Sequence, residues 1–471
     1  MALPNSRLGA DNIRQILQGK KRLFFAGIGG VSMNALAHVS VLRGFDVAGY
    51  DRSRTSITEK LETLGIKVYY TPSADNMSDR DVLIYTVAMP PDTPEIVYAE
   101  EHGIPMISRS DYLGYLMLDY DKRIGVSGTH GKSTTTAMIG CILREAGKEP
   151  TVLNGAVMKE TGTVDIIGKH DFLSFEACEY MDSFLDFNPN IAVVLNIELD
   201  HVDYFKSIEQ IKNSFTEFIN RAGEDGVAIL NLNDKDCVEI AKRAKCKVIS
   251  FAHENPLADY YSANETLVAG YPEFDIFRHG KKLARVRLSV PGEHNVSDAL
   301  AAFAACVTAG ADPEPAAKAL SEYRGICRRM EKLGFTHSGA QLFSDYAHHP
   351  TEIQATLRGI RKVCNGKLTI IFQPHTFSRT YELFNNFAAS LSSPEADEII
   401  LCDIYPARET NIYGVSSSQL SERIRKNGKK STYFDEFEKA AEYAESVSGP
   451  DDIVMIMGAG DIIKIADLLL A

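Results

Sequence analysis

Residues 125–140 read GVSGTHGKSTTTAMIG, in which a short apolar run leads into a glycine-rich loop. The pattern is typical of a strand, a tight loop and the first turns of a helix. In such a loop, backbone N–H groups and the helix N-terminus face an anion. The lysine reaches the terminal phosphates of a nucleotide, and the next hydroxyl holds Mg²⁺. We therefore predict nucleotide contacts from Gly128, Thr129, His130, Gly131, Lys132, Ser133 and Thr134.

The motif in this loop is incomplete. Val126 stands where the strict spacing GxxxxGK[ST] requires glycine, so the match is to the shorter core G-x-x-G-K-[ST]. A glycine-rich turn with a solvated lysine is therefore the alternative to a nucleotide site.

Outward from this loop, short apolar runs alternate with amphipathic stretches. This βαβ rhythm predicts an α/β fold with parallel sheets. A hairpin is expected over residues 274–290, with His279 and Gly280 in its turn. A helix is expected over residues 295–309. The predicted strands cover residues 21–27, 45–50, 82–85, 123–127, 191–196, 367–372, 398–403 and 452–457.

Length and composition limit the classes of protein. A chain of 471 residues suggests about three domains, and we place them at residues 1–120, 121–326 and 327–471. The net charge of −13 argues against a protein that wraps nucleic acid. The eight cysteines form no CxxC pair, which disfavours a zinc ribbon or a disulfide framework. No apolar run approaches the ~20 residues of a membrane helix, and the first twenty residues lack a signal core. We expect a cytoplasmic protein without a membrane partner.

A second glycine loop lies at residues 27–30, with Asp51 at the end of the next predicted strand. It resembles the dinucleotide-binding fingerprint, although Ser32 stands where the third glycine belongs. The loop would let a diphosphate approach the backbone, and NAD, FAD and a nucleotide sugar all carry one. A purely structural tight turn is the alternative.

Acidic residues gather after two predicted strands or apolar runs. Glu176 and Glu179 lie in FEACEYMDSFL, and Glu198, Asp200 and His201 lie in LNIELDHVDYF. Such positions suit Mg²⁺ ligands, although a solvated cap is the simpler interpretation of any single acid. Half of the twelve histidines fall in loops marked by Gly, Asn or Pro, which favours a polar ligand site: His130, His201, His294, His348, His349 and His375. Arginines that could grip phosphate or carboxylate lie in similar loops, at Arg328, Arg329, Arg379 and Arg408.

Taken in order, these motifs resemble the Mur ligase family, and the resemblance spans nearly the whole chain. It is carried by GIGGVSMNALA, YTVAMPPDTPEI, GTHGKSTTT, FEACEYMDSFL, NIELDHVDYF, PGEHNVSDALAA, RRMEKLG, DYAHHPTEI, QPHTFSRT, DIYPARE and GAGDI. It implies a Rossmann-like first domain that binds a UDP sugar, a central P-loop ATPase domain with a mostly parallel sheet, and a Rossmann-like last domain that docks an amino acid. The implied reaction joins L-alanine to the lactyl carboxylate of UDP-N-acetylmuramic acid, with ATP and Mg²⁺, through an acyl phosphate in peptidoglycan precursor synthesis.

The resemblance also implies roles for individual residues. Lys132 contacts the ATP phosphates and is catalytic with Glu176, His201 and Arg379; Ser133, Glu176 and His201 hold Mg²⁺. Further ATP contacts are expected from His294, Asn295, Arg328, Arg329 and Asp345. The alanine pocket is expected at Tyr346, His348 and Arg379, with the arginine on the amino-acid carboxylate. The UDP sugar is expected to meet Gly27, Gly29, Gly30, Asp51, Thr86 and Ala88.

The chain departs from the common family pattern at several positions. Ser133 replaces a frequent Thr, Cys178 a frequent acid, and Thr376 an Arg found in some members. Asp298, Met330 and Arg408 also depart, and the role of Arg408 is open. Three other functions remain as alternatives. They are the recycling ligase that adds a tripeptide to the same sugar nucleotide, a nicotinamide-dependent oxidoreductase built on residues 27–30 and Asp51, and a non-catalytic nucleotide-regulated binding protein.

Overall fold

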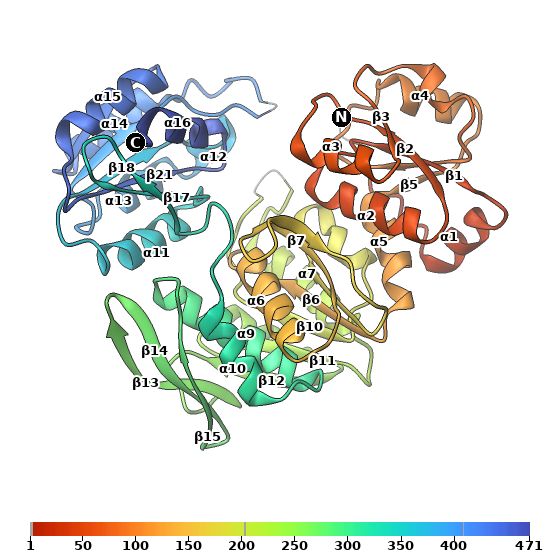
Figure 1. Cartoon of the computed structure of the whole chain (residues 1–471), viewed down its shortest axis with the longest axis horizontal. Coiled ribbons are helices and arrows are strands. Elements are labelled where there is room, and N and C mark those ends of the chain that lie inside the picture. Colours follow the sequence, from red (N-terminus) through yellow and green to blue (C-terminus); the bar gives the residue numbers. More distant parts are fainter. Residues whose placement is uncertain (1–2, 202–203, 408) are drawn as a thin grey trace. The chain divides into compact units, whose positions relative to one another are not determined.

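The computed structural model describes residues 3–201, 204–407 and 409–471, so Arg408 lies outside the described residues. Helices and strands alternate along the chain, and the strands form three separate sheets, as the α/β prediction requires (Figure 1). The chain divides into two compact units. The first holds Met1–Tyr261, Arg278–Lys281 and Leu300–Ala319, and the second holds Ser262–Phe277, Lys282–Ala299 and Leu320–Ala471.

The first sheet is wholly parallel and has the order β3-β2-β1-β4-β5. Strand order reverses beside β1, and in doubly wound folds ligands bind outside the carboxyl ends of the strands at such a point. The strands are β1 (Arg22–Ala26), β2 (Asp46–Tyr50), β3 (Lys67–Tyr69), β4 (Val82–Tyr85) and β5 (Met106–Ser108). The helices are α1 (Ala10–Leu17), α2 (Val31–Leu42), α3 (Ser56–Thr63), α4 (Pro94–Glu101) and α5 (Arg109–Leu116).

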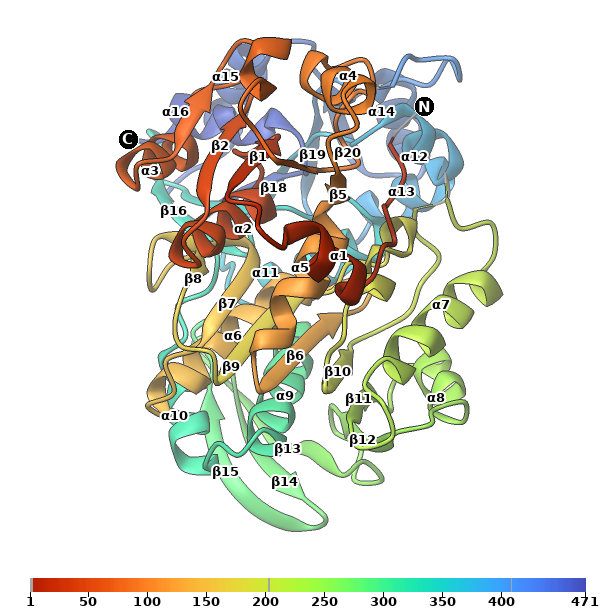
Figure 2. The ribbon, with the colours of Figure 1, turned by 90° about the vertical axis from the view of Figure 1, so that its right-hand side faces the viewer.

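The central sheet has ten strands in the order β15-β14-β13-β12-β11-β10-β6-β9-β7-β8. Strand β6 (Lys122–Ser127) lies inside it, parallel to β10 and β9, and leads into α6 (Lys132–Glu145). Helices α7 (Ile208–Asn220) and α8 (Lys235–Ala241) lie side by side next to β10 and β11 (Figure 2). The other strands are β7 (Thr151–Met158), β8 (Thr163–Ile166), β9 (Phe172–Glu176), β10 (Ile191–Val194), β11 (Val227–Asn231), β12 (Lys247–Ala252), β13 (Tyr260–Val268), β14 (Tyr271–Arg278) and β15 (Lys281–Arg287).

The predicted hairpin is confirmed as β14 and β15, with both turn residues, His279 and Gly280, at positive φ. The sequence did not reveal β13, which precedes it. The predicted helix is confirmed as α9 (Glu293–Thr308), and α10 (Pro313–Glu322) follows it.

The third sheet has the order β16-β17-β21-β18-β19-β20, and only β16 is antiparallel. The loops expected to carry ligand groups follow β17, β18, β19 and β21, at one edge of this sheet. Its strands are β16 (Glu331–Phe335), β17 (Gln341–Asp345), β18 (Leu368–Phe372), β19 (Glu398–Leu401), β20 (Lys430–Tyr433) and β21 (Ile453–Met457). Its helices are α11 (Pro350–Arg361), α12 (Phe377–Glu382), α13 (Phe384–Leu391), α14 (Ser417–Lys426), α15 (Phe437–Val447) and α16 (Ala466–Leu469).

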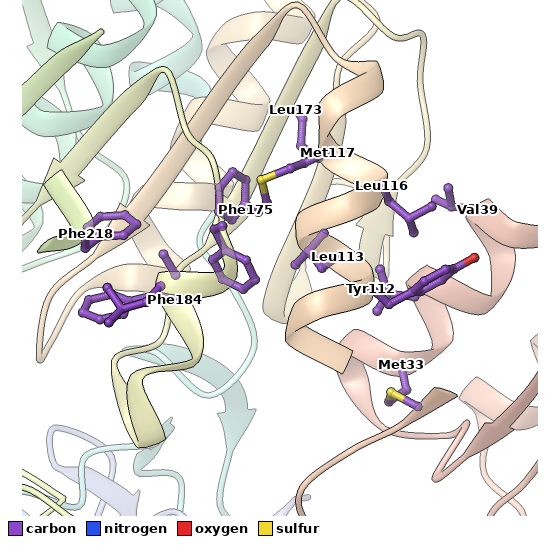
Figure 3. Close-up of a cluster of buried hydrophobic side chains, with 14 of the residues drawn as sticks. Met33, Val39, Tyr112, Leu113, Leu116, Met117, Leu173, Phe175, Phe184 and Phe218 are labelled. Carbon is purple, nitrogen blue, oxygen red and sulfur yellow. The ribbon is translucent and has the colours of Figure 1, made fainter. Parts of the chain in front are cut away.

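Within the first unit, α5 packs directly against the central sheet (Figure 3). Tyr112 and Leu116 face α2, whereas Met117 lies close to Phe175 of β9. The 3₁₀ segment η3 (Tyr180–Asp186) contributes Phe184 to the same buried cluster. One hydrophobic core therefore joins the first sheet to the central sheet. None of the helices in the described part of the chain has the length and apolar character needed to cross a membrane.

Candidate functional site

The loop between β6 and α6 has the geometry of a phosphate-binding loop. Gly128 and Gly131 adopt positive φ values of 141° and 86°, which side chains other than glycine rarely tolerate. No side chain among the described residues caps α6, so the N–H groups of its first turn remain available to an anion. The backbone N–H of His130 donates to the Asn196 side chain at 2.8 Å, which fixes the loop to the end of β10.

Lys132 lies across the mouth of this loop. Its ammonium donates to the carbonyl oxygens of Gly128 and Thr129 and to Glu179 Oε2 at 3.2 Å. Burial alone would lower the pKa of Lys132, but the neighbouring acidic groups, Glu179 first among them, together outweigh it, so the pKa lies above its ordinary value. The lysine is therefore a fixed positive charge at the end of the central sheet.

Glu179 is the acid at the centre of the site. Its side chain is only 1% exposed and lies between Lys132 and the ring of His201, whose Nε2 is 3.6 Å from Oε1. Burial would raise the pKa of Glu179, but Lys132 and His201 lower it below the ordinary value of 4.5. The sequence motif contains this residue, yet we assigned the metal role to Glu176. Nothing in the sequence distinguishes the roles of these two glutamates, which are three residues apart.

We expect Glu179→Gln to destabilise the protein by roughly 3–5 kcal/mol at neutral pH, because it leaves the ammonium of Lys132 buried without its charged partner. The folded-state pKa of Glu179 lies below 4.5, so the ion pair stabilises the fold above pH 4.5 and weakens as the pH falls through the folded-state pKa. Thermal unfolding should show the same loss of stability in Glu179→Gln at pH 5.5 and at pH 7.5, because both values lie above the folded-state pKa. The control is Glu217→Gln, which breaks an exposed pair with Arg221. An unchanged unfolding temperature for Glu179→Gln would show that the pair does not form.

Glu176 ends β9 and accepts a hydrogen bond from the backbone N–H of Gly155 on β7. Its charge also contributes to the raised pKa of Lys132, so it belongs to the same site. His201 adopts a positive φ of 50° and lies against the ring of Tyr180, at 4.8 Å between ring centroids. Glu179 thus contacts both Lys132 and His201, Glu176 acts on the lysine through its charge, and Ser133 directly follows the lysine in α6.

The loop at residues 27–30 follows β1, beside which the strand order of the first sheet reverses. The backbone N–H of Gly29 donates to Asp51 Oδ2 at 2.9 Å, which ties the loop to the end of β2. A Cβ atom on Gly27 would lie 3.1 Å from the methyl carbon of Thr86. The structure therefore brings Asp51 and Thr86, both predicted from the sequence, against this glycine loop, and Ala88 lies two residues after Thr86.

In the second unit, two arginines pack on one aromatic ring. The guanidinium carbons of Arg328 and Arg329 lie 4.8 and 5.3 Å from the ring centroid of Tyr346. Arg328 also donates to the carbonyl oxygens of Gly458 and Gly460, at 2.6 and 3.1 Å. Arg328 thus links the start of the last domain to the loop after β21.

Asp345 and the start of α9 are engaged in local contacts. The Asp345 carboxylate accepts from the backbone N–H groups of Met330 and Ala347, both at 2.8 Å. Burial raises its pKa despite Arg329 and these hydrogen bonds. The Asn295 side chain donates to Pro291 O at 2.7 Å and lies 3.2 Å from His294 Nε2.

The residues predicted for the amino-acid pocket lie in one row. The rings of Tyr346 and His348 are 5.4 Å apart, and His348 faces His375 at 5.8 Å. Arg379 Nη1 donates to His375 Nδ1 at 3.4 Å. His375 thus connects His348 to Arg379. The sequence placed His375 among six loop histidines that favour a polar ligand site, but it was not assigned to the amino-acid pocket.

Comparisons with known proteins point to one family over nearly the whole chain. Three domain families match in succession: the Mur ligase family catalytic domain over residues 23–121, the Mur ligase middle domain over 126–306 and the Mur ligase glutamate ligase domain over 328–460. The chain is 45% identical over 450 residues to UDP-N-acetylmuramate–L-alanine ligase of Caldicellulosiruptor saccharolyticus, covering 95% of this chain and 98% of that protein. It is 40% identical over 459 residues to the enzyme of that name from Clostridium acetobutylicum, covering 96% and 98%.

Solved structures give a similar result. The crystal structure of UDP-N-acetylmuramate-alanine ligase from Thermotoga maritima superposes with a TM-score of 0.80 at 28% identity, covering 95% of this chain and 97% of that one. A murein peptide ligase from Psychrobacter arcticus has a TM-score of 0.70 at 23% identity, covering 95% and 98%, which shows a shared fold.

Proposed function

We propose that this chain, which belongs to the Mur ligase family, joins L-alanine to the lactyl carboxylate of UDP-N-acetylmuramic acid with ATP. The site observation that best supports this is the arrangement of Lys132 and His201 around the buried Glu179 at the phosphate loop. The full-length relatives named for this reaction supply the substrates. We place the reaction in the cytoplasm, where ATP is available.

The chemistry requires activation because an amine does not displace oxide from a carboxylate. Transfer of the γ-phosphoryl group to a carboxylate oxygen gives an acyl phosphate and ADP. The alanine amine then attacks the carbonyl carbon, loses a proton, and phosphate leaves as the amide forms. Lys132 stabilises the negative charge that gathers as two anions meet, and it needs no reorganisation because Glu179 already holds it in place.

Mg²⁺ is part of this proposal. Glu176 and the Ser133 hydroxyl would offer the oxygen ligands that this ion prefers while it keeps some of its waters, and His201, which lies 3.6 Å from Glu179, would offer a nitrogen. When bound, the ion would neutralise charge on the phosphates and polarise them. We assign Ser133, Glu176 and His201 as its ligands and Glu179 as the acid that holds Lys132 and His201 in position.

The remaining site residues divide by domain in the proposal. Residues 1–120 bind the UDP sugar, 121–326 bind ATP, and 327–471 bind alanine. The strands of the three separate sheets fall one sheet to each residue range, which supports this division. ATP would also meet His294, Asn295, Arg328, Arg329 and Asp345. Alanine would meet Tyr346, His348 and Arg379.

We expect Gly29→Ala to weaken binding of UDP-N-acetylmuramic acid by roughly tenfold, because overpacking costs about 1–3 kcal/mol. An added Cβ atom would lie 2.8 Å from both Asp51 Oδ2 and the Thr58 methyl carbon, so the loop would have to move. Calorimetric titration without ATP measures this. The control is Gly449→Ala, whose Cβ atom would meet no heavy atom within 4 Å. Unchanged affinity would place the sugar nucleotide away from this loop.

The function itself is tested by phosphate release from ATP and Mg²⁺ with UDP-N-acetylmuramic acid. L-Alanine and the tripeptide L-alanyl-γ-D-glutamyl-meso-diaminopimelate are added in parallel. We expect release that requires both the sugar nucleotide and L-alanine. Release with the tripeptide alone would assign the chain to the recycling ligases, and no release with either acceptor would refute the proposed ligase.

A further inference from the structure

Arg109 lies at the edge of the first sheet that carries the sugar-nucleotide loops. It is the first residue of α5 and directly follows β5. The loop at 27–30 follows β1, and the loop at 86–89 follows β4, which are parallel to β5. Carboxyl ends of parallel strands share one edge, so all three segments lie on the ligand side of the sheet.

The same residue lies next to the central domain. Ser110 donates a hydrogen bond to Asp186 Oδ2 at 2.5 Å, and Asp186 ends η3, the segment that follows Glu179. Farther along α5, a Cβ atom on Gly114 would lie 2.1 Å from Asp186 O, so the helix touches η3 closely. The apolar contacts in Figure 3 hold this arrangement. Arg109 is thus fixed between the first sheet and the acidic segment of the ATP site.

The Arg109 guanidinium has no hydrogen bond or ion pair with any residue that the structure describes. Its charged neighbour Asp186 is engaged by Ser110. Burial lowers the pKa of Arg109 itself, yet a guanidinium remains charged in proteins. The partly buried guanidinium therefore has donors that are available to an anionic ligand.

Arg109 and Lys132 lie near the two ends of η3. Glu179, which directly precedes this segment, pairs with Lys132, and Asp186, which ends it, accepts a hydrogen bond from Ser110, the neighbour of Arg109. In the proposed reaction, the anion that must reach the γ-phosphate is the lactyl carboxylate.

We propose that Arg109 binds the lactyl carboxylate of UDP-N-acetylmuramic acid and orients it toward the ATP loop. This inference rests on the proposed function. A guanidinium suits the role because its paired N–H groups match the two oxygens of a carboxylate. Arg109 selects the substrate that carries the reacting group over a nucleotide sugar that lacks it.

The test compares two ligands that differ only in the lactyl group. Binding of UDP-N-acetylmuramic acid and of UDP-N-acetylglucosamine is measured by calorimetry without ATP, for the wild type, Arg109→Met and Arg109→Lys. We expect Arg109→Met to weaken binding of UDP-N-acetylmuramic acid by roughly 10- to 100-fold, and to change binding of UDP-N-acetylglucosamine by less than about threefold. Arg109→Lys should bind UDP-N-acetylmuramic acid more tightly than Arg109→Met but less tightly than the wild type. Lysine keeps the positive charge but lacks the paired N–H groups of the guanidinium.

The matched control is Arg54→Met, which removes an arginine from the surface of the same domain, where it pairs with Glu59 and Glu62. It should leave both affinities unchanged. The KM for ATP should be unchanged in Arg109→Lys, which a general loss of structure would not allow. Equal losses of affinity for both ligands would place Arg109 on the diphosphate that they share, and this would overturn the proposal. An unchanged preference of Arg109→Met for UDP-N-acetylmuramic acid over UDP-N-acetylglucosamine would also overturn it. If Arg109→Met does not fold, the ratio of the two ligand affinities in Arg109→Lys is compared with that of the wild type. A lower ratio supports the proposal, and an equal ratio overturns it.

The failure of the proposed function would look different. In that case the wild type itself would not prefer UDP-N-acetylmuramic acid and would release no phosphate with L-alanine.

Discussion

Replacement of Lys132 by alanine should abolish ligation while binding of UDP-N-acetylmuramic acid survives. The lysine is the cation of the phosphate loop, held by the carbonyl oxygens of Gly128 and Thr129 and by Glu179. Removing such an electrostatic contact to a phosphoryl group in transfer costs roughly 10³-fold or more in turnover. The sugar nucleotide is proposed to bind at residues 27–30, on a different sheet, so its affinity should be intact. Phosphate release and calorimetry on one preparation measure both properties.

Lys122→Ala provides the control, because this exposed lysine lies at the start of the strand that leads into the loop. It should retain full turnover. Retained turnover in Lys132→Ala would contradict the phosphate-loop assignment. Loss of sugar-nucleotide binding as well would show that Lys132 acts through the fold, because Glu179 would then be left buried without its partner.

The parts of the fold that local patterns specify were predicted well. The strand over residues 82–85 is confirmed to the residue, and β6 with the start of α6 is confirmed around the glycine loop. Both strands are buried apolar runs, and the glycines after β6 also restrict the path of the loop, so neighbouring residues carry the information. Strand β13 was missed because its burial alternates irregularly and its outer half is partly exposed.

The contacts that make the site depend on tertiary packing, which single-sequence patterns do not contain. Glu179 and Lys132 are 47 residues apart, and which acid of the FEACE motif turns toward the lysine depends on the backbone after it. Met181 and Asp182, which follow Glu179, adopt positive φ values of 53° and 55°. The residue types at these positions do not predict this backbone conformation. Arg109 lies in a segment without any motif, and only its missing partners in the folded chain identify it.

Replacement of Arg379 by alanine should raise the KM for L-alanine strongly or remove activity. Arg379 ends the row that runs from Tyr346 through His348 and His375, and it donates to the ring of His375 at 3.4 Å. The neighbouring Thr376 brings no charge, so we expect Arg379 to carry most of the attraction for the amino-acid carboxylate. Loss of a charge-assisted pair costs roughly 2–5 kcal/mol, so kcat/KM for alanine should fall by about 10²-fold or more.

Two further variants separate this role from a general effect. Arg379→Lys should recover only part of the loss, because an ammonium cannot engage both carboxylate oxygens as a fork does. Arg423→Ala, which removes an exposed arginine from α14 of the same domain, should behave as the wild type. The KM for ATP should stay constant throughout the series, since Arg379 is proposed to contact only alanine. Unchanged alanine kinetics in Arg379→Ala would mean that the amino acid binds elsewhere, and the row of rings would then need another explanation.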